Sequence, residues 1–357
     1  MNDAVESIAA VMPPGTLEGS AAWYGRDYQD ISDWIYHLST EEIDEIDTAV
    51  RATQAAGRDI IGVTRDNFEL PTLGDKLRAV RDEVRDGRGF ALIRGLPIEC
   101  YTLREAATAY FGIGAHMGSA RSQNGEGHVL GHVCDLGHKP KENPHQRGYR
   151  SGGPLDFHTD STDIAALLTW RKSKSGGEGK IASSVTVYNE MLRRCPDLLR
   201  EMFKPIHRDR RGEIPEGMKP WWTMPVYQWH AGYLNSHFNY NFILATDRFE
   251  ELPPMSDALR DAFRTMMEIC EVVHLSIDYK AGDIGLVNNH GIFHARGDYE
   301  EWPEADRRRY LLRLWLCPPD GRPLPESYAQ RYGSVTPGDR GGIVCPATEF
   351  KAPLEPI

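Results

Sequence analysis

The chain has 357 residues, of which 40% are hydrophobic and 26% charged, so it is long enough to bury a substantial core and is typical of a globular protein. The formal net charge is −11 and no basic run is longer than the three arginines at 307–309, which excludes nucleic acid as an expected partner. No apolar run approaches the roughly 20 residues of a membrane span, so we expect no membrane association.

The start of the chain and its cysteines indicate the compartment. The first 15 residues carry two acidic side chains and lack the basic start of a signal peptide. The six cysteines are scattered without a C-x-x-C pair, which indicates free thiols in a reducing environment. We therefore expect a cytoplasmic protein. The sequence is compatible with a homo-oligomer but does not decide the oligomeric state.

The first elements in chain order are helices. Ser39 and Glu42 form a capping box, and apolar residues follow it at helical spacing. A second helix is predicted over residues 75–86, where Gly87 ends it. We expect residues 1–88 to form a mixed, largely helical extension that packs on the core.

Strands dominate the rest of the chain. A buried strand is predicted at 89–93, and Thr102 and Glu105 form another capping box before a short helix. Helices are also expected at 188–194 and 256–274. Short apolar runs separated by turns predict further strands at 164–170, 181–187, 284–287 and 310–316. This pattern favours a mostly β fold with helical additions, a sandwich or jelly roll, over residues 89–333. Residues 334–357 form a tail.

The segment 112–154 differs from the rest of the chain in composition, because it is rich in glycine, polar residues and histidine. Loops of this length in a compact domain are usually functional or disordered. We expect Gln123, Asn124 and His132 to contact a small-molecule substrate, although these residues could equally satisfy backbone groups of the loop. A second metal site formed by His128, His132 and His138 is an alternative. The aromatic segment 221–227 could wall a pocket, but core is the preferred interpretation.

Residues 157–160, Phe-His-Thr-Asp, are the first candidate for chemistry. Residues i and i+2 of a strand point to one face, so His158 and Asp160 could share a metal ion. With 13 histidines an H-x-D is expected about once by chance, and a solvated polar pair is the competing interpretation. The segment 287–294, which contains His290 and His294, follows an apolar strand that comes after the turn at 281–283. Two histidines and one carboxylate suit Fe(II) with open positions, although zinc hydrolases use similar ligands.

The run 307–316 supplies a candidate anion site. By strand alternation Arg309, Leu311, Arg313 and Trp315 share one face, and the intervening apolar residues share the other. An arginine among apolar residues is costly to bury without an anion, and its planar fork suits a carboxylate. An internal salt bridge is the alternative.

Together these motifs resemble the taurine and 2,4-D dioxygenase family of 2-oxoglutarate-dependent oxygenases. The resemblance runs from about residue 89 to residue 333 and includes the Lys-Ser-Gly-Gly at 174–177 and the segment 288–294. Order and spacing also match, because His294 lies 134 residues after Asp160 and Arg313 lies 19 residues after His294.

This resemblance implies a double-stranded β-helix core, also called a jelly roll or cupin-like fold. It implies Fe(II), 2-oxoglutarate and O2 as cofactor and cosubstrates, with His158, Asp160 and His294 as the metal ligands. It places the far carboxylate of 2-oxoglutarate on Arg313, with Arg309 as runner-up or helper. The implied reaction hydroxylates or desaturates a small organic substrate and releases succinate and CO2.

Three further positions follow from the same comparison. His290 is expected to support the turn or line the pocket rather than bind the metal. The family often has a threonine or serine hydroxyl where this chain has Gly179, and Ser183 could substitute for it. Asp160 is intact, whereas related halogenases replace this ligand, so halogenation is not expected.

Two other functions remain as alternatives. One is a metal-dependent hydrolase on a cupin-like barrel, which would not need Arg313 to anchor a dicarboxylate. The other is a non-catalytic jelly-roll binding protein, which would not need the complete ligand set. For the oxygenase we expect the segment 112–154 to act as a mobile lid that excludes water from the metal.

Overall fold

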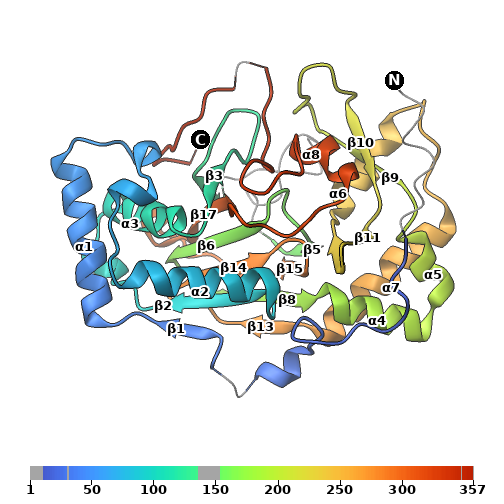
Figure 1. Cartoon of the computed structure of the whole chain (residues 1–357), viewed down its shortest axis with the longest axis horizontal. Helices are drawn as coiled ribbons and strands as arrows, with labels where there is room; N and C mark the ends of the chain where they lie inside the picture. Colours follow the sequence, from blue (N-terminus) through green and yellow to red (C-terminus); the bar gives the residue numbers. More distant parts are fainter. Residues whose placement is uncertain (1–10, 30–31, 136–152, 347, 357) are drawn as a thin grey trace.

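The computed structural model describes residues 11–29, 32–135, 153–346 and 348–356, and its centre consists of two β-sheets (Figure 1). The larger sheet contains, in spatial order, β1 (Ile35–His37), β2 (Phe90–Arg94), β14 (Ile284–Asn288), β6 (Ile164–Arg171), β17 (Tyr310–Cys317) and β3 (Ser119–Arg121), with β4 (Gly131–Cys134) also paired to β17. The smaller sheet contains β13 (Leu275–Ile277), β8 (Gly179–Ser183), β15 (Ile292–Arg296) and β5 (Leu155–His158).

Consecutive strands alternate between the sheets, since β5 is followed by β6 and β14 by β15 in the opposite sheet. This arrangement is a double-stranded β-helix, and the predicted fold class is confirmed. The inner faces meet in an apolar cluster. Its members include Phe90, Ala165, Val287 and Trp315 from the larger sheet and Ile181, Leu275 and Ile292 from the smaller one.

Three helices cover the outer face of the larger sheet (Figure 1): α1 (Thr40–Ala55), α2 (Leu73–Asp86) and α3 (Leu103–Ala115). The predicted capping boxes at Ser39 and Thr102 begin α1 and α3. In each box the hydroxyl accepts the backbone N–H of the glutamate three residues later, and the side chain of that glutamate accepts the backbone N–H of the cap residue. Gly87 ends α2 as predicted. The alternating apolar residues of β17 opposite the arginine face pack beneath these helices.

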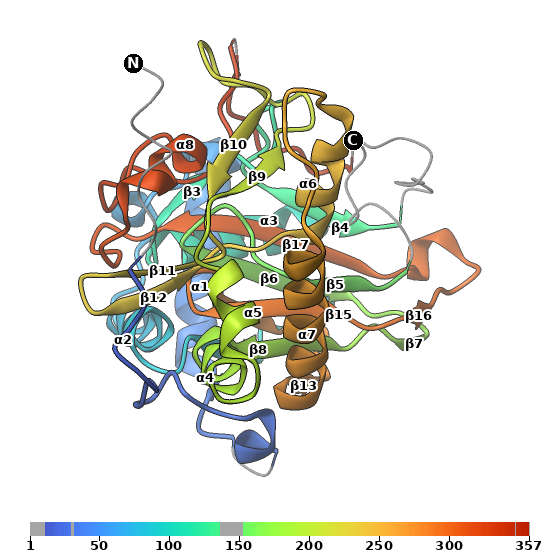
Figure 2. The same ribbon diagram turned by 90° about the vertical axis from the view of Figure 1, so that its right-hand side faces the viewer.

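The smaller sheet is covered by α4 (Ser184–Arg194), α5 (Pro196–Glu201) and α7 (Asp257–Val273), which stand in front of it in Figure 2. The strand predicted at 181–187 is wrong beyond Ser183. The Ser183 hydroxyl accepts the N–H of Thr186 at 3.0 Å and thereby starts α4, so a local cap overrides the β-branched residues that follow.

Short elements complete the fold. They are the hairpin of β9 (Ile206–Asp209) and β10 (Trp221–Met224), the hairpin of β11 (Tyr227–His230) and β12 (Tyr233–Ser236), the pair β7 (Ser175–Gly176) and β16 (Tyr299–Glu300), α6 (Tyr240–Leu244) and α8 (Ala329–Tyr332). No described helix combines the length and apolar character that a membrane crossing requires.

The segment 112–154 is not the long structureless loop that was predicted, at least over 112–135. There α3 ends, and β3 and β4 both pair with β17 as part of the larger sheet. Gln123 is only 1% exposed. Residues 136–152, which include His138 and the C-terminal part of the expected lid, lie outside the described residues.

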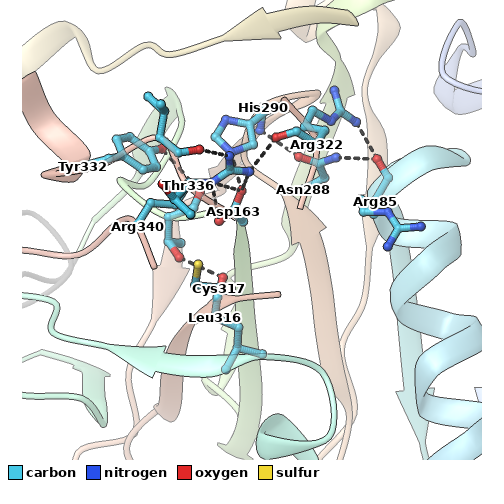
Figure 3. Close-up of polar contacts among 12 residues, drawn as sticks. Arg85, Asp163, Asn288, His290, Leu316, Cys317, Arg322, Tyr332, Thr336 and Arg340 are labelled. Carbon is cyan, nitrogen blue, oxygen red and sulfur yellow. Dashed lines mark hydrogen bonds and ion pairs between the residues drawn. The ribbon is translucent and has the colours of Figure 1, made fainter. Parts of the chain in front are cut away.

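A buried ionic network fastens the end of the chain to the core (Figure 3). Asp163 accepts hydrogen bonds from Arg340 at 2.5 and 3.1 Å, and His290 Nε2 lies 3.0 Å from the same carboxylate. Burial raises the pKa of Asp163, but His290 and Arg340 outweigh it and hold the pKa at about 2. Arg340 also donates to the carbonyl of Arg322. His290 therefore supports the turn before β15, as one of the two predicted options had it.

Candidate metal centre and cosubstrate pocket

Strand pairing brings the three predicted ligands together. His158 ends β5 and lies opposite His294 on β15, and Asp160 follows two residues after His158. One ligand atom from each of the three side chains lies within 4.8 Å of the others. His294 Nε2 is 3.9 Å from Asp160 Oδ2. Among the described residues, no other cluster of three His, Cys, Asp or Glu side chains comes this close.

The protonation states of these groups suit a cation. His158 Nδ1 lies 2.8 Å from the carbonyl of Asp156, which can only accept, so Nδ1 carries the hydrogen and Nε2 keeps its lone pair. Burial lowers the pKa of His294 to about 3, so its imidazole is neutral at pH 7. Burial raises the pKa of Asp160, but Arg313 and the two histidines outweigh it and lower the pKa to about 2. The two imidazoles and the one carboxylate are a ligand set that fits Fe(II).

Second contacts hold Asp160 in place. Its backbone N–H donates to Asn289 Oδ1 at 2.9 Å, and Trp315 Nε1 donates to its Oδ2 at 3.0 Å. Trp315 lies on the β17 face that strand alternation selected. No sequence signal indicated this role for Asn289, because it lies 129 residues from Asp160 and only the folded structure brings the two residues together.

The predicted alternation of β17 is seen in the cavity beside the metal ligands. Arg309, Leu311, Arg313 and Trp315 all line this cavity. Arg313 is 6% exposed, and its Nη1 lies 3.3 and 3.4 Å from the two oxygens of Asp160. Its Nε donates to Gln123 Oε1 at 2.7 Å. The guanidinium of Arg313 therefore borders the metal site itself.

Arg309 lies two alternation steps from Arg313 on the same strand face, with Leu311 between them, and it is beside Gly177. It is 8% exposed, and its guanidinium lies over the ring of Tyr299, 5.3 Å from the centroid. Burial and the charge of Arg296 lower the pKa of Arg309. Within the described part of the chain, its Nη1 is buried without a hydrogen-bond partner. A buried guanidinium nitrogen in this state is costly unless an anion binds it.

Gly179 stands where the family often has a threonine or serine, and the structure gives a reason for this difference. A Cβ at this position would lie 2.5 Å from Cε2 of Tyr279, so the tyrosine ring occupies the space of a larger side chain. Tyr279 also crowds Gly285 from the other sheet, and both glycines and the tyrosine line the cavity. Ser183 is fully buried, with its hydroxyl donating to the carbonyl of Ala21, and is not a lining residue.

The structure does not bring the three expected substrate contacts to the cavity lining. Gln123 makes two hydrogen bonds with Arg313: its Oε1 accepts from the Arg313 guanidinium, and its Nε2 donates to the Arg313 carbonyl at 2.7 Å. Asn124 shapes its own loop by accepting the N–H of His128. His132 lies on β4 between the Tyr310 hydroxyl, at 2.6 Å, and the carbonyl of residue 353. Hydrogen bonds of this kind also occupy His128 and His132 of the alternative second metal site. Its third member, His138, lies outside the described residues.

Other residues that line the cavity come from segments outside the two central sheets. They include Arg211, Trp222, His237, Phe242 and Arg331. Trp222 belongs to the aromatic segment 221–227, where core was the preferred interpretation. The core interpretation is confirmed for Val226 and Tyr227, which pack against the smaller sheet. It also holds for Trp222 and Met224, which belong to another buried cluster, although Trp222 lines the cavity as well. The arginines carried no sequence signal, because they come from loops and short helices far apart in the chain.

Comparison with known proteins agrees with this geometry. Residues 50–315 match the family described as taurine catabolism dioxygenase TauD, TfdA family. The chain belongs to this family. It is therefore a non-haem iron dioxygenase of the class that uses 2-oxoglutarate and O2.

Relatives and solved structures extend the comparison. The chain is 32% identical to FR-33289 synthase of Streptomyces rubellomurinus over 89% of this chain and 95% of the relative. It is 30% identical to a taurine hydroxylase-like protein of Stachybotrys chartarum over 87% and 84% of the two chains. Asparagine oxygenase with Fe(II), hydroxyasparagine and succinate has a similar fold, with a TM-score of 0.60, 15% identity and coverage of 79% and 93%. The iron oxygenase OrfP with Fe, succinate and hydroxyarginine also has a similar fold, with a TM-score of 0.58 and 14% identity. The match covers 79% of this chain and 94% of OrfP.

Proposed function

We propose that this dioxygenase hydroxylates or desaturates a small organic molecule and converts 2-oxoglutarate to succinate and CO2. One observation carries the proposal: the His158, Asp160 and His294 cluster opens on the same cavity as Arg309, a buried cation whose Nη1 has no partner among the described residues. A metal-binding face and a buried anion site in one cavity suit a ligand that chelates a metal at one end and carries a carboxylate at the other.

The three ligands would hold Fe(II) on one face and leave the remaining positions to the cavity. When bound there, Fe(II) supplies the redox chemistry that couples decarboxylation of 2-oxoglutarate to oxidation of the substrate. This chain keeps the His294 imidazole neutral and directs the Nε2 atom of His158 toward the metal position through the bond at its Nδ1. It also keeps Asp160 ionised and orients it through Trp315. Apolar lining residues such as Leu311 and Val287 keep water from the reacting groups.

We assign the far carboxylate of 2-oxoglutarate to Arg309 rather than to Arg313, where the sequence comparison placed it. Arg313 already contacts Asp160 and Gln123, so its guanidinium lies at the metal end of the cavity. Arg309 lies four residues from Arg313 on the same face of the cavity, where we expect the far end of a five-carbon dicarboxylate chelated at the metal. The Tyr279 hydroxyl takes the role of the family's threonine or serine, because its ring fills the space above Gly179.

Succinate formation tests the proposal. The purified protein, supplied with Fe(II), 2-oxoglutarate and O2, should release succinate, and metabolite pools should show a substrate that gains one oxygen or loses two hydrogens. Asp160→Ala should abolish both. A hydrolase would instead add the mass of water without consuming 2-oxoglutarate. A binding protein would retain ligands without producing succinate, and either result would overturn the proposal.

A further inference from the structure

The loop that carries the ligand Asp160 is tied to the turn that precedes the ligand His294. Asn289 lies in this turn. Its side chain accepts the backbone N–H of Asp160 at 2.9 Å, and its own backbone N–H donates to the carbonyl of Asp163 at 2.9 Å. The next residue, His290, places its Nε2 3.0 Å from the Asp163 carboxylate, and both side chains are buried. Three contacts therefore hold the two ligand-bearing segments together.

Arg340 supplies the charge that completes this arrangement (Figure 3). Its Nε and Nη2 donate to the Asp163 carboxylate at 3.1 and 2.5 Å. The same guanidinium, which is 1% exposed, also donates to the carbonyls of Val335 at 2.9 Å and Arg322 at 2.8 Å. Gly321 leaves room for it, because a Cβ at this position would lie 2.7 Å from Arg340 Nη2. A buried guanidinium with these partners has one defined position, so it also fixes the carboxylate that it binds.

Residues 332–342, here called the C-terminal strap, also contact the ligand loop through their backbone. The N–H of Gly342 donates at 2.9 Å to the carbonyl of Ser161, the residue after Asp160. Gly342 has a φ of 82°, which glycine adopts without strain. The Tyr332 hydroxyl donates to the carbonyl of Asp160 at 3.4 Å. The structure describes every residue of the strap and none of them lines the cavity, so the strap bears on the metal site through the ligand loop.

Strand pairing alone does not place Asp160. His158 and His294 lie opposite each other on β5 and β15, so the register of these strands fixes both histidines. Asp160 lies beyond the end of β5 and before β6 begins at Ile164, outside both strands. Its position relative to the histidines therefore depends on the contacts of its loop. Removing groups that hold metal ligands in this way commonly weakens metal binding by roughly 10- to 100-fold.

We infer that Asp163, His290 and Arg340 are positioning residues of the metal site. They fix the carboxylate ligand Asp160 relative to the ligand His294. The inference deepens the proposed function, because it rests on these ligands holding Fe(II). None of the three described positioning residues is itself a ligand or lines the cavity. Because coupling between two sites is reciprocal, Fe(II) binding should in turn stabilise the C-terminal strap.

Metal affinity tests the inference without turnover. The metal-free protein is titrated anaerobically with Fe(II) in competition with a chromogenic chelator, and with Co(II), whose visible bands depend on ligand geometry. Arg340→Gln and Asp163→Asn should weaken Fe(II) binding by roughly 10- to 100-fold and shift the Co(II) bands. His290→Ala should still bind one Fe(II) per chain at saturation, but about tenfold more weakly. Arg340→Lys keeps the charge beside Asp163 and should recover part of the affinity that Arg340→Gln loses.

A core variant separates positioning from loss of stability. Ile46 of α1 is fully buried in the apolar cluster beneath the outer helices, so Ile46→Ala destabilises the fold without altering this network. Its Fe(II) affinity and Co(II) bands should equal those of the unaltered protein. An equal loss of affinity in Ile46→Ala and Arg340→Gln would show that instability alone is responsible and would overturn the inference. Unchanged affinity and bands in Arg340→Gln would overturn it as well.

Hydrogen exchange of the unaltered protein gives a second test that requires no variant to fold. Fe(II) should slow exchange in the C-terminal strap more than in α1, and an equal effect on both would refute the coupling. The oxygenase function and the positioning can fail separately. Succinate formation without this coupling would leave the proposed function intact and refute the positioning. Coupling in protein that never forms succinate would support the positioning and refute the proposed function.

Discussion

Replacing Arg309 by glutamine tests where the cosubstrate is anchored. The substitution keeps a polar side chain of similar length but removes the charge and the planar fork. Arg309 is 8% exposed and lies over Tyr299, so the carboxylate that it binds would be desolvated on both sides. Removing one partner of such a pair costs about 2–5 kcal/mol, which is a loss in affinity of roughly 30-fold or more.

The measurement is an anaerobic titration of the Fe(II) protein with 2-oxoglutarate, followed by the weak visible charge-transfer band expected for this family or by heat. Arg308→Gln is the matched control, because Arg308 is the neighbouring arginine and is exposed. Its affinity should equal that of the unaltered protein. Arg309→Lys should fall between the two, since it restores charge without bidentate geometry. Normal affinity in Arg309→Gln together with a large loss in Arg313→Gln would return the anchor to Arg313 and refute the reasoning.

Three further changes have defined outcomes. His294→Ala should lose about one bound Fe(II) per chain, whereas His290→Ala should keep it, as metal analysis would show; the reverse would exchange their roles. Tyr279→Phe should weaken 2-oxoglutarate about tenfold, and unchanged affinity would exclude its hydroxyl from the anchor. Asp163→Asn should lower the free energy of unfolding in urea by about 3–5 kcal/mol, because it leaves a buried arginine unpaired, whereas the half-exposed Asp320→Asn should cost less than about 1 kcal/mol. The folded-state pKa of Asp163 is depressed to about 2, so its stabilisation is present above the ordinary value of 3.8 and should disappear as pH falls toward 2; a difference that persists at that pH would contradict the pairing.

Local patterns determined much of this protein. The capping boxes at Ser39 and Thr102 begin helices where predicted, because a cap depends on residues three positions apart. The alternation of β17 assigned Arg309 and Arg313 to one face and apolar residues to the other, because the strand repeat is two residues. The ligand candidates were also visible, since the H-x-D spacing and a histidine after a strand and turn are sequence features.

Other properties were decided only by tertiary structure. The sequence predicted Gln123 to be a polar loop residue. In the structure it is buried beside Arg313, which lies 190 residues away in the chain, because β17 pairs with β4. Gly179 read as a lost hydroxyl, but the ring of Tyr279, 100 residues away, occupies that space. Strand alternation treats Arg309 and Arg313 as equivalent, and only the tertiary structure shows that it is Arg313 that contacts Asp160.

The residues that line the cavity outside the two central sheets show most clearly what the sequence could not determine. Arg211, Trp222, His237 and Arg331 come from a loop, a hairpin, the end of another hairpin and a short helix, and no spacing in the chain relates them. The buried pair of Asp163 and Arg340 holds the C-terminal segment that carries Arg331 against the core, beside the start of β6. The sequence by itself determined the chemistry at the metal, where ligands recur on regular strands. The tertiary structure decided the rest of the cavity lining, because that lining is assembled from irregular segments whose positions depend on packing.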